Sequence, residues 1–385
     1  MTELDTLIKD MKPFIQEAWT KSGFQQPTTI QQQAIPLITD GKDVIAQSPT
    51  GTGKTLAYLL PLLGKIDVEK KAVQAVIIAS SQELIMQILE EIGKWATGSG
   101  IRAASFIGGA NVKRQLEKLK KHPHIALGTP GRMLELIKQK KLKMHEVKTI
   151  ILDECDQLLV PEHTSTVNNI VKSTLSERQM VMFSATLPSH IEKIAAEMAK
   201  SPSMLKINKD ETIKAEEVSH FYFIAEQRDK MKMLEKISRL NGIKGLVFVR
   251  DIGNLTVLSE KLDFKNIKVS TLHSDLDKTE RQKALKDFKE GRTNLLLATD
   301  VAARGLDIKG ITHVVHYDFP KDMEQYVHRS GRTGRFGASG TVLSIINERE
   351  ERELKKFGNH LNIPVQKMMI RGGDITEYST RDQRK

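Results

Sequence analysis

Ser48-Pro49-Thr50-Gly51-Thr52-Gly53-Lys54-Thr55 is the stretch that decides the fold of the first half of the chain. It follows the apolar segment 43–46 and opens a run with helical character. A strand, a loop of small residues and a helix in this order predict a phosphate-binding loop, because backbone N–H groups and the helix dipole converge on an anion. We expect all eight residues to bind a nucleotide, with Lys54 at its terminal phosphates and the Thr55 hydroxyl on Mg²⁺.

A second chemical signal is the apolar run Ile151-Leu152, which ends in the carboxylates Asp153 and Glu154. Strand ends of this kind face the crevice in which open α/β sheets bind ligands. Asp153 can hold Mg²⁺, directly or through water, and Glu154 can orient or deprotonate an attacking water. An acidic pair after a strand is by itself more often an ordinary helix start. The phosphate loop in the same domain favours the catalytic interpretation.

The rest of the chain alternates short apolar runs with helical stretches, which indicates open α/β sheets with buried parallel strands. In the first half the runs are 76–79, 124–128, 150–153 and 181–184, with helical stretches at 55–63 and 82–95. The pattern stops in the charged segment 206–217 and restarts with runs at 245–249, 267–272, 294–298, 313–316 and 341–346. We therefore expect one α/β domain over 1–208, a linker over 209–217, a second α/β domain over 218–370 and a short polar tail over 371–385.

The composition is that of a folded protein, with 39% hydrophobic and 28% charged residues. This balance excludes a disordered chain. The net charge of +11 favours a polyanionic partner, although a generally basic surface has the same charge. Cys155 is the single cysteine, so an intramolecular disulfide and a Cys-rich metal site are excluded. We see no secretion signal and no bilayer-spanning stretch, and expect a cytoplasmic protein without membrane contact.

The segment 328–335 reads His-Arg-Ser-Gly-Arg-Thr-Gly-Arg and places three guanidinium groups among small residues. Bidentate donors of this kind can stabilise the charge that develops on a transferred phosphoryl group. A basic surface turn is the alternative for this stretch alone. With these arginines on the second domain, hydrolysis would depend on closure of the two domains.

Together and in this order, the motifs closely resemble those of the DEAD-box RNA helicases, especially small bacterial members with little beyond the core. The resemblance runs from about Gly23 to Gly337 and includes the acidic box Asp153-Glu154-Cys155-Asp156, in which Cys155 is expected to be a packing residue. It implies two tandem RecA-like domains joined by a flexible linker, with ATP and Mg²⁺ as cofactors. The implied activity is RNA-stimulated ATP hydrolysis that drives local RNA unwinding or ribonucleoprotein remodelling.

The resemblance also assigns nucleotide contacts outside the phosphate loop. Gly23-Phe24 and Pro27-Thr28-Thr29-Ile30-Gln31 resemble the adenine-reading motif, with Phe24 and Gln31 as ligands of the base. The side-chain amide of Gln31 suits a base edge because it offers a donor and an acceptor together. By resemblance, Asp307 reads the ribose, and Arg332 and Arg335 occupy the arginine-finger positions.

The remaining motifs imply RNA contacts and coupling between the domains. The implied RNA-binding residues are Gly108, Gly109, Thr129, Pro130, Gly131, Arg132, Arg250 and Thr299. The implied coupling residues are Asp156, Ser184, Thr186 and His328. The segment Ala79-Ser80-Ser81-Gln82-Glu83-Leu84 stands where the family usually has Pro-Thr-Arg-Glu-Leu.

Two alternatives stay open, a DNA helicase on the same architecture and a nucleotide-gated RNA clamp with little unwinding. The acidic box and the Gln31 motif argue against the first, and Lys54, Glu154 and the finger arginines argue against the second. Protein contacts to the sugar–phosphate backbone of RNA depend little on its sequence, while contacts to the 2′-OH groups distinguish RNA from DNA. We expect a monomer that acts on structured or single-stranded RNA, with ribosomal precursor particles or RNA in turnover as candidate targets.

Overall fold

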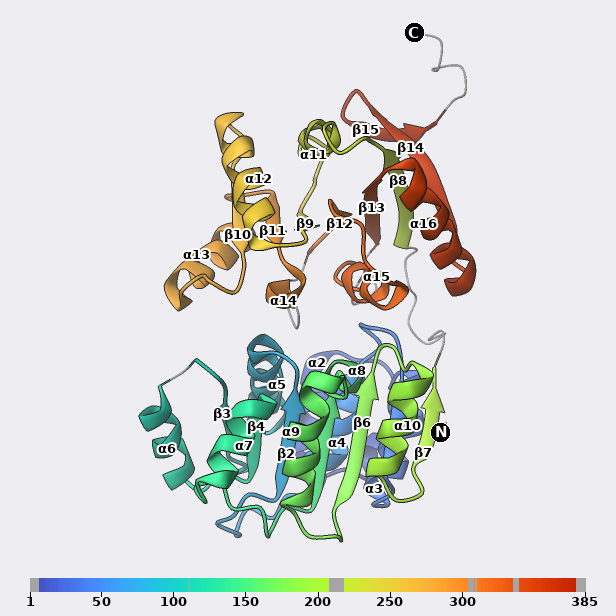
Figure 1. Cartoon of the computed structure of the whole chain (residues 1–385). Helices are drawn as coiled ribbons and strands as arrows, with labels where there is room; N and C mark the ends of the chain where they lie inside the picture. Colours follow the sequence, from blue (N-terminus) through green and yellow to red (C-terminus); the bar gives the residue numbers. More distant parts are fainter. Residues whose placement is uncertain are drawn as a thin grey trace. The chain divides into compact units, whose positions relative to one another are not determined.

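The computed structural model describes residues 7–109, 111–207, 218–303, 308, 310–334 and 339–378. The chain folds into two compact units, Met1–Ile213 and Lys214–Lys385, each built on a sheet of its own (Figure 1). The predicted linker, 209–217, lies outside the described residues, so its bounds stay a prediction.

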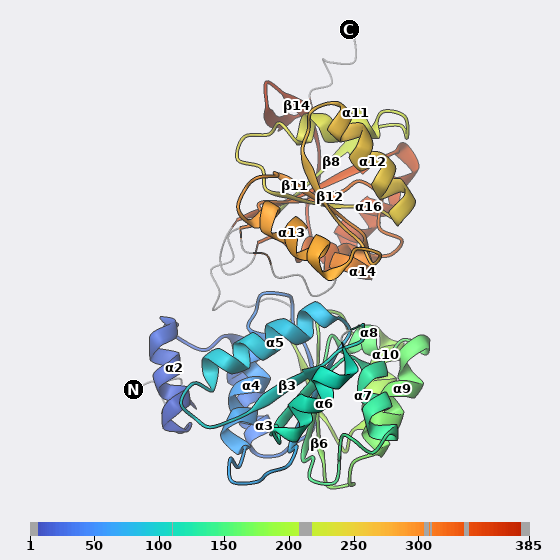
Figure 2. The same cartoon turned by 90° about the vertical axis from the view of Figure 1, so that its left-hand side faces the viewer.

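Unit 1 is a parallel sheet with helices on both faces. Its described strands are, in spatial order, β3 (Ala103–Phe106), β4 (Ile125–Gly128), β2 (Ala75–Ala79), β5 (Thr149–Asp153), β6 (Gln179–Ser184), β1 (Val44–Gln47) and β7 (Ser203–Lys206), and each neighbouring pair is parallel. Its helices are α2 (Pro13–Ser22), α3 (Thr29–Thr39), α4 (Lys54–Lys65), α5 (Gln82–Trp95), α6 (Val112–Lys120), α7 (Pro130–Lys138), α8 (Cys155–Leu158), α9 (Pro161–Lys172) and α10 (Ser189–Met198). Figure 2 shows α3, α4 and α5 on one face of the sheet and α7, α9 and α10 on the other.

The continuous apolar runs of unit 1 follow from this two-sided burial. Side chains of a strand point alternately to opposite faces, so a strand covered on both sides is apolar at every position. In β2, Ile77 and Ala79 pack in the cluster beneath α3, α4 and α5, whereas Val76 and Ile78 pack in the cluster on the other face. The prediction of an α/β domain with a mostly parallel sheet is confirmed here.

Unit 2 repeats this architecture with one antiparallel addition. Its described strands are, in spatial order, β10 (Val269–Leu272), β11 (Leu295–Ala298), β9 (Gly245–Phe248), β12 (His313–His316), β13 (Gly340–Ile346), β8 (Val218–Ile224), β14 (Val365–Arg371) and β15 (Asp374–Glu377). The pair β14–β15 is antiparallel and the other pairs are parallel. The helices are α11 (Lys230–Ile237), α12 (Ile252–Phe264), α13 (Lys278–Lys289), α14 (Asp300–Ala303), α15 (Met323–Ser330) and α16 (Glu348–Leu361).

The prediction of a polar tail from residue 371 is wrong at its start, because β14 and β15 form a hairpin. Gly372 and Gly373 make the turn with φ of 63° and 88°, the two positive values that a tight two-residue hairpin requires. Ile370 and Ile375 pack against the apolar cluster on the face covered by α11 and α12. The segment resembles a tail in sequence because β14 and β15 mix these apolar residues with charged ones and are only partly buried.

Candidate functional site

The predicted motifs of unit 1 gather at one edge of its sheet. In a parallel sheet all strands end at the same edge, where α/β proteins bind ligands. The phosphate loop follows β1, the acidic box follows β5 and Ser184 ends β6, and these three strands are neighbours. The loops after β2, β4 and β3 carry the segment 80–82, Thr129 to Arg132 and the pair Gly108-Gly109. The residues predicted to bind the nucleotide thus lie along one half of this edge, and those predicted to bind RNA lie along the other half.

The phosphate loop holds the ammonium group of Lys54 in its curve. Lys54 Nζ donates to the carbonyl oxygens of Ser48 at 2.7 Å and Pro49 at 2.8 Å. The hydroxyls of Ser48 and Thr52 are hydrogen-bonded to each other at 2.7 Å, which closes the loop from inside. Carbonyl oxygens carry only partial charges, so a phosphate is a stronger acceptor for Lys54. The loop therefore fits the phosphates of a nucleotide.

Gln31, predicted to read adenine, also braces the phosphate loop. Its side chain is 3% exposed. Its Oε1 accepts from the Thr28 N–H at 3.0 Å, and its Nε2 donates to the carbonyl oxygen of Gly53 at 3.2 Å. The Thr28 hydroxyl donates to the carbonyl oxygen of Thr52 at 2.7 Å. The base contact stays a prediction, but the amide already ties the α3 start to the loop.

Phe24, the other predicted adenine ligand, belongs to an aromatic cluster. Its ring stacks on Trp95 with centroids 6.3 Å apart and an interplanar angle of 11°, and it lies 5.6 Å from the ring of Trp19. The side chain is nevertheless 47% exposed. An aromatic face held in this way loses little freedom when it contacts a ligand. Its adenine contact stays a prediction.

Asp153 lies almost fully buried at the end of β5, at 4% exposure. Its carboxylate accepts from the Tyr58 hydroxyl at 2.7 Å and from the Glu154 N–H at 3.0 Å. Burial is the main influence and raises the pKa of Asp153 to about 6, while the hydrogen bond from Tyr58 lowers it. The hydroxyl of Thr55 hydrogen-bonds to the same Tyr58 oxygen. Tyr58, which the sequence alone did not indicate, thus contacts both predicted Mg²⁺ ligands, Thr55 and Asp153. The hydroxyl oxygen of Thr55 and the carboxylate oxygens of Asp153 are ligands that Mg²⁺ prefers.

Glu154 follows in a left-handed backbone conformation, with φ 54° and ψ 53°. Few residues other than glycine adopt this conformation, and it occurs often at functional sites. Glu154 caps α8, since its carbonyl oxygen accepts from the N–H groups of Gln157 at 2.9 Å and Leu158 at 3.2 Å. Its side chain accepts a hydrogen bond from the Ser80 hydroxyl at 2.7 Å, a partner that the sequence analysis did not identify.

The predicted coupling residues of unit 1 link these elements. The Thr186 hydroxyl donates to Asp156 Oδ2 at 2.5 Å, which connects the segment after β6 to the acidic box. The carbonyl oxygen of Ser184 accepts from the Ser48 N–H at 3.0 Å, which connects β6 to the phosphate loop. The Ser184 hydroxyl is buried with no hydrogen-bond partner among the described residues. A displacement of β6 would therefore move or break hydrogen bonds to both the phosphate loop and the acidic box.

Cys155 is a packing residue, as predicted. It is fully buried in the apolar cluster of α7 and α9. Burial raises the pKa of its thiol well above the ordinary value, so the reactive thiolate is not formed near neutral pH.

The predicted RNA-contact loops of unit 1 touch one another. The Gly108 N–H donates to the Thr129 hydroxyl at 3.4 Å. Pro130 and Gly131 form the first turn of α7, which directs backbone N–H groups out of the sheet edge. The guanidinium of Arg132 is only 10% exposed and pairs with Glu135 at 2.8 Å. The RNA contact of Arg132 stays a prediction. Gly109 has a positive φ of 68°, which favours glycine at this turn.

In unit 2, Arg250 and Thr299 lie just after strands, whereas His328 lies in α15 and Arg332 just after that helix. Arg250 follows β9 with an exposed side chain, and its N–H donates to Asp318 at 2.8 Å. Thr299 follows β11 and is 7% exposed. Arg332 is 6% exposed, and its Nε donates to the carbonyl oxygen of His328 at 3.3 Å. The predicted ribose ligand Asp307 and the finger Arg335 lie outside the described residues.

Arg329, the first arginine of segment 328–335, contacts other parts of unit 2 through its buried side chain. Arg329 is 3% exposed and donates to both carboxylate oxygens of Asp300 at 2.7 Å. It also donates to the carbonyl oxygen of Asp318 at 2.7 Å and lies over the ring of Phe248. This bidentate pair, buried on the Arg329 side and partly exposed at Asp300, holds α15 to α14. Sequence alone gives no sign of which arginine in the segment has this role.

The chain matches two family models, DEAD/DEAH box helicase over residues 28–194 and Helicase conserved C-terminal domain over residues 229–337. It is 55% identical over 97% of its length to a Bacillus subtilis protein named "Probable ATP-dependent RNA helicase YfmL", 99% of which is covered. The chain belongs to the DEAD-box ATP-dependent RNA helicases. A second relative is the DEAD-box ATP-dependent RNA helicase CshC of Bacillus cereus. It is 47% identical to this chain, and the match covers 98% of this chain and 97% of CshC.

Solved structures agree with this assignment. Saccharomyces cerevisiae Dbp5 bound to RNA and ADP BeF₃ matches the helicase with a TM-score of 0.87, 28% identity and 95% coverage of both chains. Mss116p bound to single-stranded RNA and AMP-PNP matches with a TM-score of 0.83 and 26% identity, over 96% of the helicase and 80% of that chain. The predictions of two RecA-like domains and of an enzyme that uses ATP to act on RNA are therefore confirmed.

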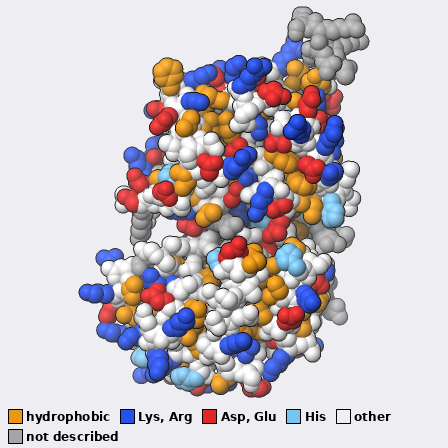
Figure 3. Space-filling model, in the orientation of Figure 1, with side chains coloured by type: hydrophobic (Ala, Val, Ile, Leu, Met, Phe, Trp, Pro, Cys, Tyr) orange, Lys and Arg blue, Asp and Glu red, His pale blue; other side chains and the backbone are white. Residues whose placement is uncertain are grey.

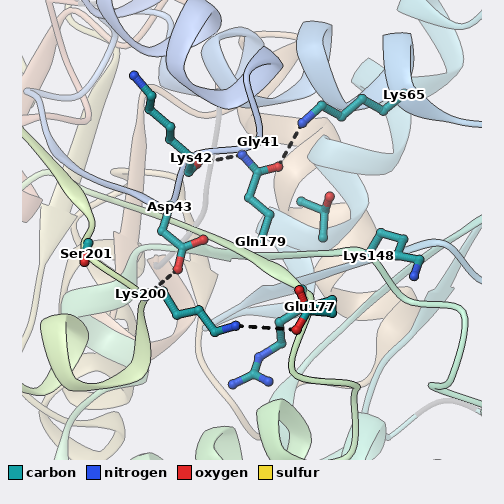
Figure 4. Close-up of a pocket in the computed structure, with 11 residues that line it drawn as sticks. Gly41, Lys42, Asp43, Lys65, Lys148, Glu177, Gln179, Lys200 and Ser201 are labelled. Atoms are coloured by element: carbon teal, nitrogen blue, oxygen red, sulfur yellow. Dashed lines mark hydrogen bonds and ion pairs between the residues drawn. The ribbon is translucent and has the colours of Figure 1, made fainter.

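A cavity of about 410 Å³ lies at the opposite edge of unit 1, around the amino ends of β1, β5 and β6 (Figure 4). Its polar centre serves the fold. Asp43 accepts from the N–H groups of Met180 at 2.8 Å and Lys200 at 2.6 Å. The Gln179 amide donates to the carbonyl oxygens of Ile38 and Lys42. None of the predicted site residues is among the described residues that line this cavity.

The distribution of charged side chains can be followed on the face of the helicase that Figure 3 shows. Figure 3 shows lysine and arginine side chains interspersed with acidic ones over the visible faces of both units. The net charge alone therefore does not mark an RNA path on this side. In the described part of the chain, no helix has the length and apolar character that a membrane crossing needs.

Proposed function

We propose that this helicase hydrolyses ATP with Mg²⁺ at the carboxyl edge of the unit 1 sheet, and that RNA stimulates this hydrolysis. The observation that supports it most is a pair of hydrogen bonds that joins the phosphate loop, the end of β6 and the acidic box. The Ser48 N–H donates to the carbonyl oxygen of Ser184 at 3.0 Å, and the Thr186 hydroxyl donates to Asp156 at 2.5 Å. A change at the phosphates thus has a direct route to the acidic box.

The side chains suit distinct steps of the reaction. Lys54 and the N–H groups of the loop bind the phosphates, and Thr55 and Asp153 hold Mg²⁺. The ion supplies positive charge against the phosphates when it is bound. Glu154 orients the attacking water and accepts its proton. The proposed further nucleotide ligands are Phe24 and Gln31 at the base, Asp307 at the ribose and Arg332 and Arg335 at the terminal phosphate.

RNA is proposed to lie along the other half of the edge and on unit 2. Its proposed contacts are Gly108, Gly109, Thr129, Pro130, Gly131, Arg132, Arg250 and Thr299. Backbone contacts of this kind carry little sequence preference. His328 and Asp156 would couple hydrolysis to closure of the units, which separates a few base pairs at a time. We propose a cytoplasmic monomer whose targets are ribosomal precursor RNA or RNA in turnover.

The test compares ATP turnover with single-stranded RNA and with single-stranded DNA of the same sequence, alongside unwinding of a short RNA duplex. We expect stimulation by RNA, unwinding that requires ATP, and loss of both in Lys54→Ala. Stronger activation by DNA would show a DNA helicase. ATP-dependent RNA binding without turnover or unwinding would show a clamp, and would sink the proposal.

A further inference from the structure

The loop after β2 places a hydroxyl group against the side chain proposed to activate water. Strands β2 and β5 pair in parallel, with Ala79 opposite Asp153. Ser80 and Glu154 are therefore the first residues beyond the ends of the two strands, side by side at the sheet edge. Ser80 Oγ donates to Glu154 Oε2 at 2.7 Å, although 74 residues separate them in the chain.

Both ends of this hydrogen bond are held by their own backbones. Ala79, before Ser80, is a fully buried strand residue, and Ser81, after it, caps α5 by accepting from the Leu84 N–H at 3.1 Å. On the other side, the Glu154 N–H donates to Asp153, and its carbonyl oxygen accepts from Gln157. The hydroxyl and the carboxylate therefore meet because the sheet fixes them, and not because two mobile surface side chains happen to touch.

We propose that Ser80 is a positioning residue for Glu154 in ATP hydrolysis. Its hydroxyl fixes one carboxylate oxygen and so sets the direction in which the carboxylate faces the attacking water. This inference rests on the proposed role of Glu154. A carboxylate on a flexible side chain samples several rotamers, and one anchored oxygen removes most of them. Small errors in the placement of a reacting group are costly to the rate.

The test is made on the full chain with three variants. Ser80→Ala removes the hydroxyl, Ser80→Thr keeps it, and Thr174→Ala removes a buried hydroxyl elsewhere in unit 1, which donates to the carbonyl oxygen of Val171 at 2.7 Å. We expect Ser80→Ala to lower the RNA-stimulated kcat about tenfold while the KM for ATP changes by less than about twofold. Ser80→Thr restores most of the rate. Thr174→Ala controls for a general loss of stability in unit 1 and keeps kcat close to that of the wild type.

A second readout needs neither nucleotide nor activity. In protein labelled with ¹³C-glutamate, the carboxylate signal of Glu154 is assigned by its loss in Glu154→Gln. We expect this signal to shift in Ser80→Ala and to stay in place in Ser80→Thr and Thr174→Ala. An unmoved signal in Ser80→Ala would overturn the contact itself, even in a protein without ATPase activity.

The kinetic outcomes decide the role. An unchanged kcat in Ser80→Ala, an equal loss in Thr174→Ala, or a loss confined to KM would each overturn the positioning role. A rise of RNA-independent turnover in Ser80→Ala would overturn it as well, because the bond would then restrain Glu154. If the wild type itself lacks RNA-stimulated turnover, the proposed function fails and the role of Ser80 in it fails with it, while the ¹³C signal still reports on the contact.

Discussion

The Tyr58 hydroxyl donates a hydrogen bond to Asp153 Oδ2 at 2.7 Å in the interior of unit 1. Tyr58 is fully buried and Asp153 nearly so. The bond links α4, which begins at the phosphate loop, to the end of β5, which carries the acidic box. It opposes the effect of burial, which raises the pKa of Asp153 to about 6.

Tyr58→Phe removes this donor. The pKa of Asp153 in the metal-free protein then rises above about 6, so the pH titration profile of its carboxylate, followed by ¹³C NMR, moves to higher pH. The loss of one bond to a buried carboxylate also lowers the free energy of unfolding by about 1–3 kcal/mol at pH 8. Tyr222→Phe is the matched control, because the buried Tyr222 donates to Glu351 in unit 2 at 2.8 Å. A Tyr58→Phe profile identical to that of Tyr222→Phe would contradict this role.

Asp153→Asn should stabilise the nucleotide-free and metal-free protein while it abolishes turnover. The folded-state pKa of about 6 exceeds the ordinary 3.8, so the folded state loses stability as the pH rises between these two values and does not regain it above pH 6. The loss corresponds to roughly 3 kcal/mol. We expect Asp153→Asn to gain up to this amount in the urea unfolding of unit 1 at pH 8, and the gain to vanish towards pH 4. A variant less stable than the wild type at pH 8 would refute this.

Gly53→Ala should disable the phosphate loop. Gly53 has φ 88°, and a Cβ there would lie 2.4 Å from Gln31 Nε2. Gly41→Ala is the control, because Gly41 has φ 79° but open space around the position of a Cβ. Both variants lose about 1–2 kcal/mol for left-handed backbone. Only Gly53→Ala should also lose nucleotide affinity, measured by titration with a fluorescent ATP analogue. Equal affinity in the two variants would contradict the bracing of the loop by Gln31.

Arg329→Lys should destabilise unit 2, because lysine cannot donate in parallel to both oxygens of Asp300. With Arg329 3% and Asp300 22% exposed, we expect a loss of about 2 kcal/mol in thermal unfolding. Arg292→Lys alters the exposed pairs with Asp287 and Glu290 and should leave the melting temperature close to that of the wild type. Similar melting temperatures for the two variants would show that Arg329 has no structural role.

Sequence predicts the fold of this protein well where local and global signals agree. The helix expected over 82–95 is observed as Gln82–Trp95, since its apolar face repeats along the whole helix. The strand at 313–316 is found at the same residues. The hairpin at 365–377 was missed, because only a few of its side chains are apolar and its partner β8 is distant in sequence.

The motifs themselves were visible in the sequence, but their mutual contacts were not. Tyr58 resembles any other apolar position of α4, and Ser80 was notable only as a departure from the family pattern. Their hydrogen bonds to Asp153 and Glu154 depend on the order β2-β5-β6-β1, which brings together residues far apart in the chain. Arg329 and Arg332 look equivalent in sequence, and the partner Asp300 distinguishes them.

The central claim is that Glu154 activates water for an ATP hydrolysis that RNA switches on. The most direct test measures the ATP turnover of the wild type and of Glu154→Gln, each with and without single-stranded RNA, together with the affinity of both proteins for ATP. We predict that RNA stimulates the wild type, and that Glu154→Gln binds ATP equally well but loses at least about 100-fold in rate with RNA present. Turnover of Glu154→Gln at the wild-type, RNA-stimulated rate would contradict the account.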